Sequence, residues 1–447
     1  MPGDVGPAQG PGRLAHPIRP FHPFPPGGGT VDLTAWGGPL APPVLRPTTV
    51  EEVAAGLREA ARAGWTVVPR GSGLHQGYGY APSRADRILD LTALRRVLRH
   101  RPANLTVRVE AGIQLGELNA LLAEHGQWLP LDPPLGAQAT IGGILATGLS
   151  GPLRARYGSA RDLLIGVRVV LADGTVIQGG GEVVKNVAGY DLPKLFHGSL
   201  GTLGVIVEAA FKLWPRPRAE ATWAFGFAEP GAAMPLVLAM LRHPGFPLAV
   251  ELVGAAGWAA LRGTLDLPED PRARVWVLVR AGGWPAQVDR IGRDAEALAA
   301  PARVRVRLPE ANAQALWAAV PDLAALADPS PRDRLWVRLG LLPAQIPEAI
   351  PLIEWDEAVA ARWHAHGTVG LVYAQGVGDP EALTQWGERL QGFAVAQGGH
   401  FTILGGPEPL KRRLGLWAPQ RPERAVMQRL KAQLDPEGRL NPGRLGW

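Results

Sequence analysis

Residues 184–207, which read VKNVAGYDLPKLFHGSLGTLGVIV, are the most informative stretch of this 447-residue chain. Four glycines fall at positions 189, 198, 201 and 204, and Ser199 and Thr202 place hydroxyls between them. Glycine removes the side chain where backbone must turn tightly or lie against a ligand. The apolar residues 205–207 then begin a strand. The stretch predicts a loop that holds a bound cofactor, and standing alone it also fits a glycine-rich connection without a ligand.

Two further glycine-rich segments occur upstream, so residues 184–207 form the third segment in chain order. The first segment, residues 69–77, reads PRGSGLHQG and follows the β-prone run 65–68. Such a loop can point several consecutive N–H groups at a pyrophosphate, with Arg70 balancing the charge. No Lys-Ser or Lys-Thr follows the glycines, and the helix and distant acid of a dinucleotide fingerprint are missing. The loop is therefore neither a Walker nor a Rossmann motif.

The second segment, residues 133–148, reads PPLGAQATIGGILATG, with RYGS at 156–159 close behind. Its small residues indicate close approach of backbone to an extended ligand. Around these loops, Thr with Glu three residues on predicts a capped helix from about residue 49 to Gly64. Residues 114–125 predict a helix with inward leucines at 115, 118, 121 and 122. Asp173-Gly174 predicts a hairpin, and residues 367–373 predict a strand.

Together these segments resemble the vanillyl-alcohol-oxidase-type (PCMH-type) FAD-binding family, and within it the FAD-binding E subunits of bacterial glycolate oxidase. The resemblance extends from about residue 47 to residue 447. It rests on the segments 140–143, 156–158, 170–174, 185–192 and 198–204, and on the ending LDPEGRLNPGR at 434–444. That ending also resembles the ending of D-lactate and D-2-hydroxyglutarate dehydrogenases.

The resemblance implies an α+β fold with a two-subdomain PCMH-type FAD-binding domain followed by an α+β cap domain. It places a disordered Pro/Gly-rich arm at residues 1–43, the FAD-binding domain at 44–217, the cap at 218–430, and a tail at 431–447 that packs back on the FAD-binding domain. The implied FAD-binding residues are Pro69, Arg70, Gly71, Ser72, Gly73, Leu74, His75, Pro134, Leu135, Gly136, Thr140, Ile141, Gly142, Gly143, Ala146, Thr147, Gly148, Tyr157, Gly158, Lys185, Gly201, Gly204, Val205 and Ile206.

The implied function is that of an FAD-holding subunit in a complex that oxidises glycolate to glyoxylate. A paralogous FAD-binding subunit would carry the substrate chemistry, and an iron–sulfur subunit would pass electrons onward. Two alternatives stay open: a stand-alone FAD-dependent 2-hydroxy acid dehydrogenase, and a non-catalytic assembly scaffold. Oxidation of a hydroxy acid needs a base and a cation for the carboxylate. In the stand-alone alternative, His366 or His400 with a nearby arginine would supply them.

Relatives with the substrate chemistry resemble each other in paired metal-binding histidines and a Glu-His-Gly triplet, and neither pattern appears in residues 218–447. His364 and His366 come nearest, but their spacing on a strand provides two side chains and no visible third ligand. No metal site is therefore predicted. The catalytic residues stay unassigned, His75 is an alternative point of covalent FAD attachment, and Tyr190 with Asp191 is expected to pack beneath the flavin.

Composition excludes several other classes. The chain has no cysteine, which excludes disulfides, thiolate zinc sites and an iron–sulfur cluster held by its own thiolates. Its formal charge of +6 comes from basic residues interleaved with acids, so nucleic-acid binding is not predicted. The longest uncharged stretch, residues 133–153, is broken by proline and glycine and does not predict a membrane span. Without a secretory signal pattern, we expect a cytoplasmic location, with the complex bringing it to the inner face of the membrane.

Overall fold

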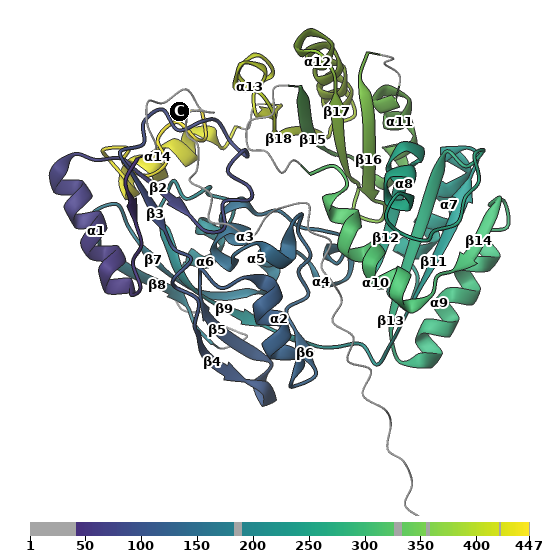
Figure 1. Cartoon of the computed structure of the whole chain (residues 1–447), viewed down its shortest axis with the longest axis horizontal. Coiled ribbons are helices and arrows are strands. Elements are labelled where there is room, and N and C mark those ends of the chain that lie inside the picture. The colour runs from purple at the N-terminus through teal and green to yellow at the C-terminus, as the bar shows by residue number, and fades with distance from the viewer. Residues whose placement is uncertain (1–41, 183–189, 326–332, 355–357, 420–421, 447) are drawn as a thin grey trace, which may run out of the picture.

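The computed structural model describes residues 42–182, 190–325, 333–354, 358–419 and 422–446. The predicted arm and Lys185 lie outside these ranges, apart from residues 42 and 43. Figure 1 shows the blue and purple N-terminal half beside a green half built on a large sheet, with the yellow C-terminal segment returning to the N-terminal half. The predicted α+β class is confirmed, because helices and sheets occur in both halves.

A small parallel sheet begins the fold, with β3 between β1 and β2. Its strands and the helix beside them are β1 (Val44–Leu45), α1 (Val50–Ala63), β2 (Val67–Arg70) and β3 (Arg87–Asp90). The N-cap Thr49 accepts the backbone N–H of Glu52 at 3.1 Å, and Gly64 ends the helix at φ +71°. The predicted capped helix is confirmed. Strand β2 runs directly into the first glycine-rich loop.

An antiparallel sheet follows in the order β4-β5-β9-β7-β8. Its strands are β4 (Val97–Arg101), β5 (Thr106–Glu110), β7 (Leu164–Val170), β8 (Val176–Gly180) and β9 (Val205–Lys212). The accompanying helices are α2 (Leu115–Ala123), α3 (Ile141–Thr147), α4 (Arg154–Tyr157), α5 (Ala160–Leu163) and α6 (Leu192–Phe196), and β6 (Gln127–Trp128) pairs separately with β10 (Trp214–Pro215). The predicted hairpin joins β7 to β8, with Gly174 at φ +82°.

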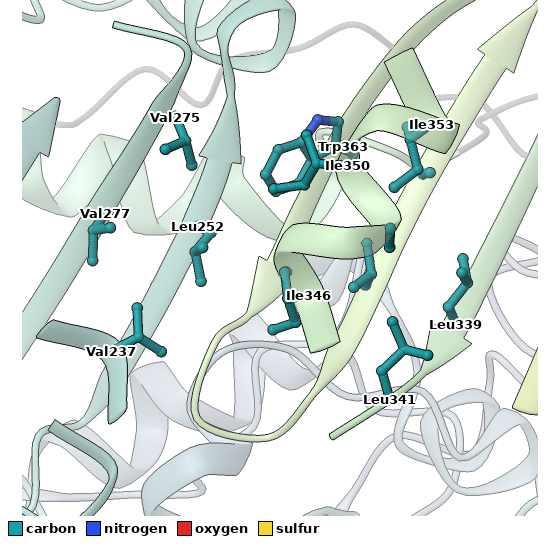
Figure 2. Packing of buried hydrophobic residues seen from close by; sticks show 14 of the residues in the cluster. Val237, Leu252, Val275, Val277, Leu339, Leu341, Ile346, Ile350, Ile353 and Trp363 are labelled. Carbon is teal, nitrogen blue, oxygen red and sulfur yellow. The ribbon is translucent and has the colours of Figure 1, made fainter. Parts of the chain in front are cut away.

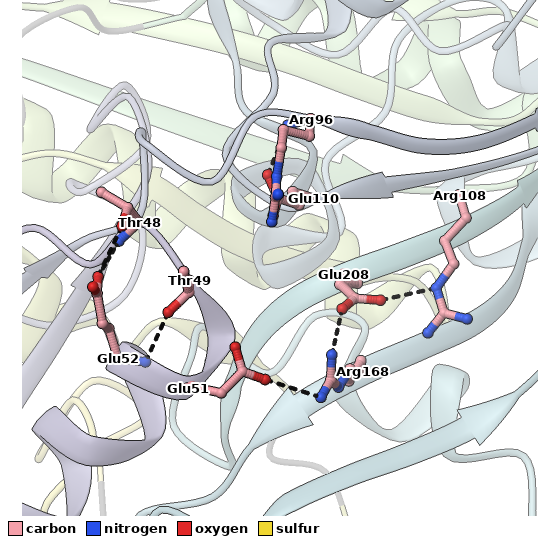
Figure 3. A network of polar contacts seen from close by, with 9 residues as sticks. All are labelled: Thr48, Thr49, Glu51, Glu52, Arg96, Arg108, Glu110, Arg168 and Glu208. Carbon is pink, nitrogen blue, oxygen red and sulfur yellow. Dashed lines mark hydrogen bonds and ion pairs between the residues drawn. The ribbon is translucent and has the colours of Figure 1, made fainter.

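A buried carboxylate ties the middle strands of this sheet together. Glu208 on β9 accepts from Nε of Arg108 on β5 at 2.8 Å and from Nη1 of Arg168 on β7 at 2.7 Å (Figure 3). Arg168 also lies 3.7 Å from Glu51 of α1. Paired charges of this kind hold neighbouring strands in register. The contact between Arg168 and Glu51 also attaches α1 to this sheet. Strand β9 of the sheet begins at the end of the third glycine-rich segment.

The second half is built on an antiparallel sheet whose described strands follow the order β14-β11-β13-β12-β16-β17-β15-β18-β19. These strands are β11 (Ala219–Phe227), β12 (Ala249–Gly254), β13 (Val275–Gly283), β14 (Val304–Arg307), β15 (Arg334–Gly340), β16 (Ala360–His366), β17 (Leu371–Val377), β18 (His400–Gly405) and β19 (Trp417–Ala418). The helices are α7 (Pro230–Leu241), α8 (Ala255–Arg262), α9 (Pro285–Leu298), α10 (Glu310–Ala319), α11 (Ile346–Glu354), α12 (Pro380–Ala396) and α13 (Glu408–Leu414).

The two faces of the large sheet have different neighbours, because side chains alternate along each strand. One face packs against helices including α7 and α11, where Val237 and Ile350 approach strand residues such as Leu252 (Figure 2). The other face is divided. Helix α8 covers part of it, with Trp258 stacked on Trp276 at 4.3 Å between ring centroids. The part formed by β15, β17 and β18 packs against the N-terminal half, so polar side chains there lie between the two halves.

The C-terminal segment completes the first sheet. After α14 (Arg424–Leu434), Leu440 forms a parallel bridge with Val67 of β2. The backbone N–H of Val67 donates to the carbonyl of Arg439 at 2.8 Å, and the N–H of Asn441 donates to the carbonyl of Val67 at 3.0 Å. The segment after α14 is thereby fixed beside the first glycine-rich loop. The predicted domain boundaries at residues 43, 217 and 430 stay predictions.

Two local predictions were wrong. Leu121 was expected to face inward but is 43% exposed, because α2 places it on the solvent side. The strand expected at residues 367–373 begins four residues later, since residues 367–370 turn between β16 and β17. Within the described ranges, no helix combines the length and apolarity that crossing a bilayer requires.

Candidate functional site

A cleft with about 750 Å³ of empty volume, part of it open to solvent, lies where the three glycine-rich segments meet. Each segment leaves or enters a strand or helix at this point: the first follows β2, the second enters α3, and the third precedes β9. The lining residues are Pro69, Arg70, Gly71, Ser72, Gly73, Leu74, His75, Gln76, Leu91, Ala111, Ala139, Thr140, Gly142, Gly143, Ala146, Thr147, Leu200, Gly201, Gly204, Val205, Ile206, Asn441 and Arg444. The structure thus brings together segments that the sequence separates by more than a hundred residues.

The glycines of the cleft allow segments to approach more closely than side chains would permit. A Cβ at Gly71 would lie 2.0 Å from Oγ1 of Thr140, which joins the first segment to the second. A Cβ at Gly201, where φ is +67°, would lie 3.1 Å from Nδ2 of Asn441. Gly143 differs, because its Cβ would meet only Oγ1 of Thr140, at 3.1 Å. At Gly71 and Gly201 the missing side chain lets two segments pack closely together. At Gly143 it leaves space that is not filled by protein.

Arg70 lines the cleft and forms an ion pair with a buried carboxylate. Its Nη2 donates to Oδ2 of Asp90 at 2.6 Å, and both side chains are nearly buried. The positive charge of Arg70 is therefore already paired with a protein carboxylate, since β2 and β3 are parallel neighbours with these two residues in register. The other cation that lines the cleft is Arg444, from the C-terminal segment.

Seven of the predicted FAD-binding residues do not line the cleft: Pro134, Leu135, Gly136, Ile141, Gly148, Tyr157 and Gly158. Ile141 points into the core with 0% exposure, and Tyr157 packs edge-on against Trp128 and Trp214. A small residue beside a lining residue in the sequence is a weak indication of FAD binding, because neighbouring residues along a chain face different sides and only some of them face the cleft. Lys185 lies outside the described residues, so its place at the cleft stays a prediction.

Sequence reasoning missed the contribution of the C-terminal segment to this cleft. Asn441 is 4% exposed, and its Nδ2 donates to the carbonyl of Leu200 at 2.8 Å. Its Oδ1 has no hydrogen-bond partner among the described residues, although it is buried. The signal that could have found Asn441 and Arg444 was the ending at 434–444, which had been recognised as a motif but not connected to the cleft.

His75 lines the cleft, and its side chain contacts the backbone of the second segment. Its Nε2 lies 2.9 Å from the carbonyl oxygen of Pro134. Burial lowers the pKa of His75 to about 4, and the Pro134 carbonyl only partly opposes this shift. The imidazole is therefore neutral near pH 7, with Nε2 as the donor to Pro134. Covalent attachment of FAD to His75 stays an alternative.

The structure places Tyr190 and Asp191 at the surface. Tyr190 is 94% exposed, and Asp191 is also exposed, at the N-terminus of α6. The residues from 183 to 189, which precede the pair, lie outside the described ranges. Packing of this pair beneath the flavin therefore stays a prediction.

A second polar cluster, formed by Glu251, His364 and His366, lies on the face of the large sheet that includes Tyr373. Oε2 of Glu251 is 3.2 Å from Nδ1 of His364, and Oε1 is 2.8 Å from Nδ1 of His366. The expectation that no third ligand lies near the two histidines was wrong, because β12 pairs with β16 and places Glu251 opposite His366. Their donor atoms lie within 4.8 Å of one another and could hold a metal ion.

Further groups surround this cluster. Tyr373 stacks on His364 with 5.1 Å between ring centroids, and it donates to the Ser150 carbonyl of the N-terminal half at 3.3 Å. Arg338 pairs with Tyr373 across β15 and β17. Burial raises the pKa of Glu251 to about 7 and lowers that of His366 to about 3. A buried cation, two imidazoles and a carboxylate thus gather between the halves, whereas His400 begins β18 at the sheet end beside Gly340.

The cleft fits FAD on two independent grounds. Its glycines leave backbone exposed along three segments, as an extended phosphate-containing ligand requires. The buried Oδ1 of Asn441 also offers an acceptor without a protein donor, and such an orphan is a place where a ligand N–H or O–H can bind. The residues of the cleft are therefore compatible with FAD.

Comparisons with known proteins agree with this geometry. Residues 41–180 match the family model described as an FAD binding domain, and residues 418–445 match the one described as the C-terminal domain of FAD linked oxidases. The second match contains Asn441 and Arg444, which the structure places at the cleft.

Three relatives illustrate the range of similarity. Glycolate oxidase subunit GlcE of Escherichia coli (strain K12) is 45% identical over 30% of this chain and 38% of its own length. Glycolate oxidase subunit GlcD of Bacillus subtilis (strain 168) is 30% identical over 57% of this chain and 54% of its length. The mitochondrial D-lactate dehydrogenase [cytochrome] of Arabidopsis thaliana is 28% identical over 90% of this chain and 73% of its length. The matches to the two subunits thus span about two fifths and about half of those relatives.

Solved structures show the fold. The 4-ethylphenol oxidase from Gulosibacter chungangensis superimposes with a TM-score of 0.67 and 20% identity, over 90% of this chain and 88% of the oxidase. A structure of p-cresol methylhydroxylase gives the same TM-score with 19% identity. The chain therefore has the fold of these FAD-dependent oxidases and carries a segment that matches the FAD binding domain, and FAD is its cofactor.

Proposed function

We propose that this chain is the FAD-binding subunit of a complex that oxidises glycolate, a 2-hydroxy acid, to glyoxylate. The observation that carries the proposal is the cleft between the three glycine-rich segments, together with the similarity of its N-terminal part to GlcE. FAD supplies the acceptor for two electrons and a proton. In this proposal the cleft residues bind and orient it, with Gly143 leaving room for the ligand and Asn441 accepting a hydrogen bond from it.

The partners in the proposal are a paralogous FAD-binding subunit that carries the substrate chemistry and an iron–sulfur subunit. The similarity to both GlcE and GlcD supports a complex of related subunits. The chain has no cysteine, so thiolates for an iron–sulfur cluster must come from another polypeptide. We place the complex in the cytoplasm, at the inner face of the membrane.

The absorption spectrum of the purified full chain, followed by anaerobic addition of glycolate, tests this proposal. We expect a flavin spectrum that stays oxidised with glycolate until the partner subunits are added. Bleaching by glycolate in the chain alone would replace the proposal with the stand-alone enzyme. A colourless preparation that takes up no added FAD would leave only the assembly scaffold.

The stand-alone 2-hydroxy acid dehydrogenase is retained as a second candidate because of the polar cluster between the halves. Arg338 supplies a buried cation suited to a carboxylate, and His366, oriented by Glu251, supplies a base. If this candidate holds, Arg338→Lys lowers dye reduction by the chain alone and raises KM for D-lactate or glycolate. Loss of FAD from the same variant would instead indicate a structural defect, so the flavin spectrum is the necessary control.

A further inference from the structure

Two cations from the C-terminal quarter of the chain bind five successive backbone carbonyls in residues 76–80. Arg444 donates to the carbonyls of Gln76 at 2.7 Å, Tyr78 at 2.5 Å and Tyr80 at 3.2 Å. Nζ of Lys411 donates to the carbonyls of Gly77 at 2.7 Å and Gly79 at 3.0 Å. The carbonyls therefore alternate between the two side chains along the segment. Residues 76–80 belong to no helix or strand, so their backbone carbonyls accept hydrogen bonds from two charged side chains instead.

Helix α13, which carries Lys411, makes further contacts with the same segment. Oε2 of Glu408 accepts the backbone N–H of Ala81 at 3.0 Å, and the hydroxyl of Tyr80 donates to the carbonyl of Lys411 at 3.4 Å. Helix α13 follows β18 of the large sheet, whereas residues 76–81 belong to the N-terminal half. One short segment thus joins the two halves through polar contacts on both sides.

The same segment is continuous with the wall of the FAD cleft. Residues 69–76 line the cleft, and Gln76 is both a lining residue and the first of the five acceptors. Gly79 sits at φ +90°, and a Cβ there would lie 2.9 Å from the carbonyl oxygen of Arg444. The backbone at 76–80 can therefore shift little without breaking contacts to Lys411 or Arg444.

The environment of Lys411 shows that carbonyls, rather than an ion pair, hold its ammonium group. Lys411 is 3% exposed, and its contact with Glu408, 4.0 Å away, is longer than its two contacts with carbonyl oxygens. Burial, together with the smaller effect of neighbouring Arg444, lowers the pKa of Lys411 to about 8. Burial of an ammonium group costs free energy unless hydrogen bonds compensate for the lost water. At Lys411 the carbonyls of Gly77 and Gly79 supply this compensation.

We propose that Lys411 and Arg444 form a clamp that couples occupation of the FAD cleft to docking of α13, with Lys411 as a positioning residue that never touches the cofactor. Arg444 reaches both the cleft and the segment, and Lys411 reaches the segment alone. When FAD binds, it fixes the backbone of residues 69–76. Because residues 76–80 continue from this loop and contact Lys411 and Arg444, α13 is then held more firmly against the N-terminal half. This inference rests on the proposed binding of FAD in the cleft.

Hydrogen exchange of the full chain, with and without FAD, tests the coupling directly. We expect added FAD to slow exchange of amides in residues 408–414 of the wild-type protein, although none of these residues lines the cleft. In Lys411→Met, which is similar in length but has no donor, we expect that slowing to disappear. We also expect the Kd for FAD to rise about tenfold to a hundredfold, as for loss of donors to two buried carbonyls.

Arg413→Met is the matched control. Arg413 lies on the same helix and loses the same charge, but it pairs with Glu381 and Glu388 of α12 instead of the 76–80 segment. We expect it to keep both the FAD affinity and the exchange response of the wild-type chain. Should Lys411→Met fail to fold, the wild-type exchange measurement still decides the inference.

The outcomes separate the inference from the proposed function. FAD binding by the wild type without any change at residues 408–414 would overturn the clamp and leave the FAD site standing. Unchanged affinity and an unchanged exchange response in Lys411→Met would do the same, and would make Lys411 a purely structural residue. Failure of the wild-type chain to bind FAD at all would overturn both.

Discussion

Oε1 of Glu251 lies 2.8 Å from Nδ1 of His366, which joins strands β12 and β16 across 115 residues of sequence. The same carboxylate also contacts His364, and all three side chains are almost completely buried. Removal of a buried acceptor leaves its donors unsatisfied, whereas removal of a donor leaves only one contact unmade. The cluster is thus expected to depend more on Glu251 than on either histidine.

We therefore expect Glu251→Ala to lower the free energy of unfolding by about 3 kcal/mol, as for loss of the central group of a buried network. Glu251→Gln keeps the shape and one acceptor, and it should be less destabilising. Urea denaturation of the full chain measures both. Equal stability of the alanine variant and the wild type would show that the cluster contributes nothing to the fold.

The metal content of the same cluster gives a second prediction. At 3.2 and 2.8 Å, the contacts between Nδ1 and the carboxylate are hydrogen-bond distances, so we expect the three residues to be stable without an ion. Dialysis against a chelator should then leave the denaturation curve unchanged. Zinc retained at one equivalent per chain, and lost in Glu251→Gln, would instead assign Glu251, His364 and His366 as metal ligands.

Gly143 allows the FAD cleft to be tested without disturbing the apoprotein. A Cβ at this position meets only Oγ1 of Thr140, so Gly143→Val should fold but fill space that the cofactor needs. We expect the purified variant to lose its flavin absorbance while its thermal unfolding matches that of FAD-free wild type. Gly231→Ala, where nothing lies within 4 Å of the new Cβ, is the control and should stay yellow. A fully yellow Gly143→Val protein would count against the cleft.

His75 should make stability depend on pH below neutrality. Its pKa is lowered from 6.5 to about 4 by burial, so between these values the unfolded chain binds a proton that the folded chain does not. Stability from this group is present above pH 6.5 and is lost as the pH falls toward 4, by up to about 3 kcal/mol. Unfolding free energies at pH 7.5 and 5 measure the loss, which should be smaller in His75→Gln. An identical pH slope in the variant would assign the loss to other groups.

Local signals in the sequence were sufficient for some features of this structure. The Thr49 cap, the turn at Gly174 and the glycine-rich segments each depend on neighbours within a few residues, and such patterns determine backbone conformation directly. Sixteen of the 24 proposed FAD-binding residues line the cleft. They could be found locally because a high density of glycine indicates close approach of backbone to a ligand.

Contacts set by strand pairing could not be predicted in this way. Arg70 looks like a free cation until β3 places Asp90 beside it, and two histidines look like an incomplete site until β12 supplies Glu251. Nothing near residue 70 or residue 364 in the sequence identifies those partners. Asn441 and Arg444 fall between these cases, since the sequence predicted a tail that packs on the FAD-binding domain but did not indicate that these two side chains line the cleft.

The pairing of Leu440 with Val67 has a consequence for how the protein is made. The first wall of the FAD cleft leaves the ribosome early, yet Asn441 and Arg444 are synthesised more than 360 residues later. Contacts of such long sequence separation form late, after the intervening chain has folded around them. Cofactor loading should therefore be a post-translational event, and a nascent chain stalled at residue 430 should carry folded glycine loops that cannot yet retain flavin.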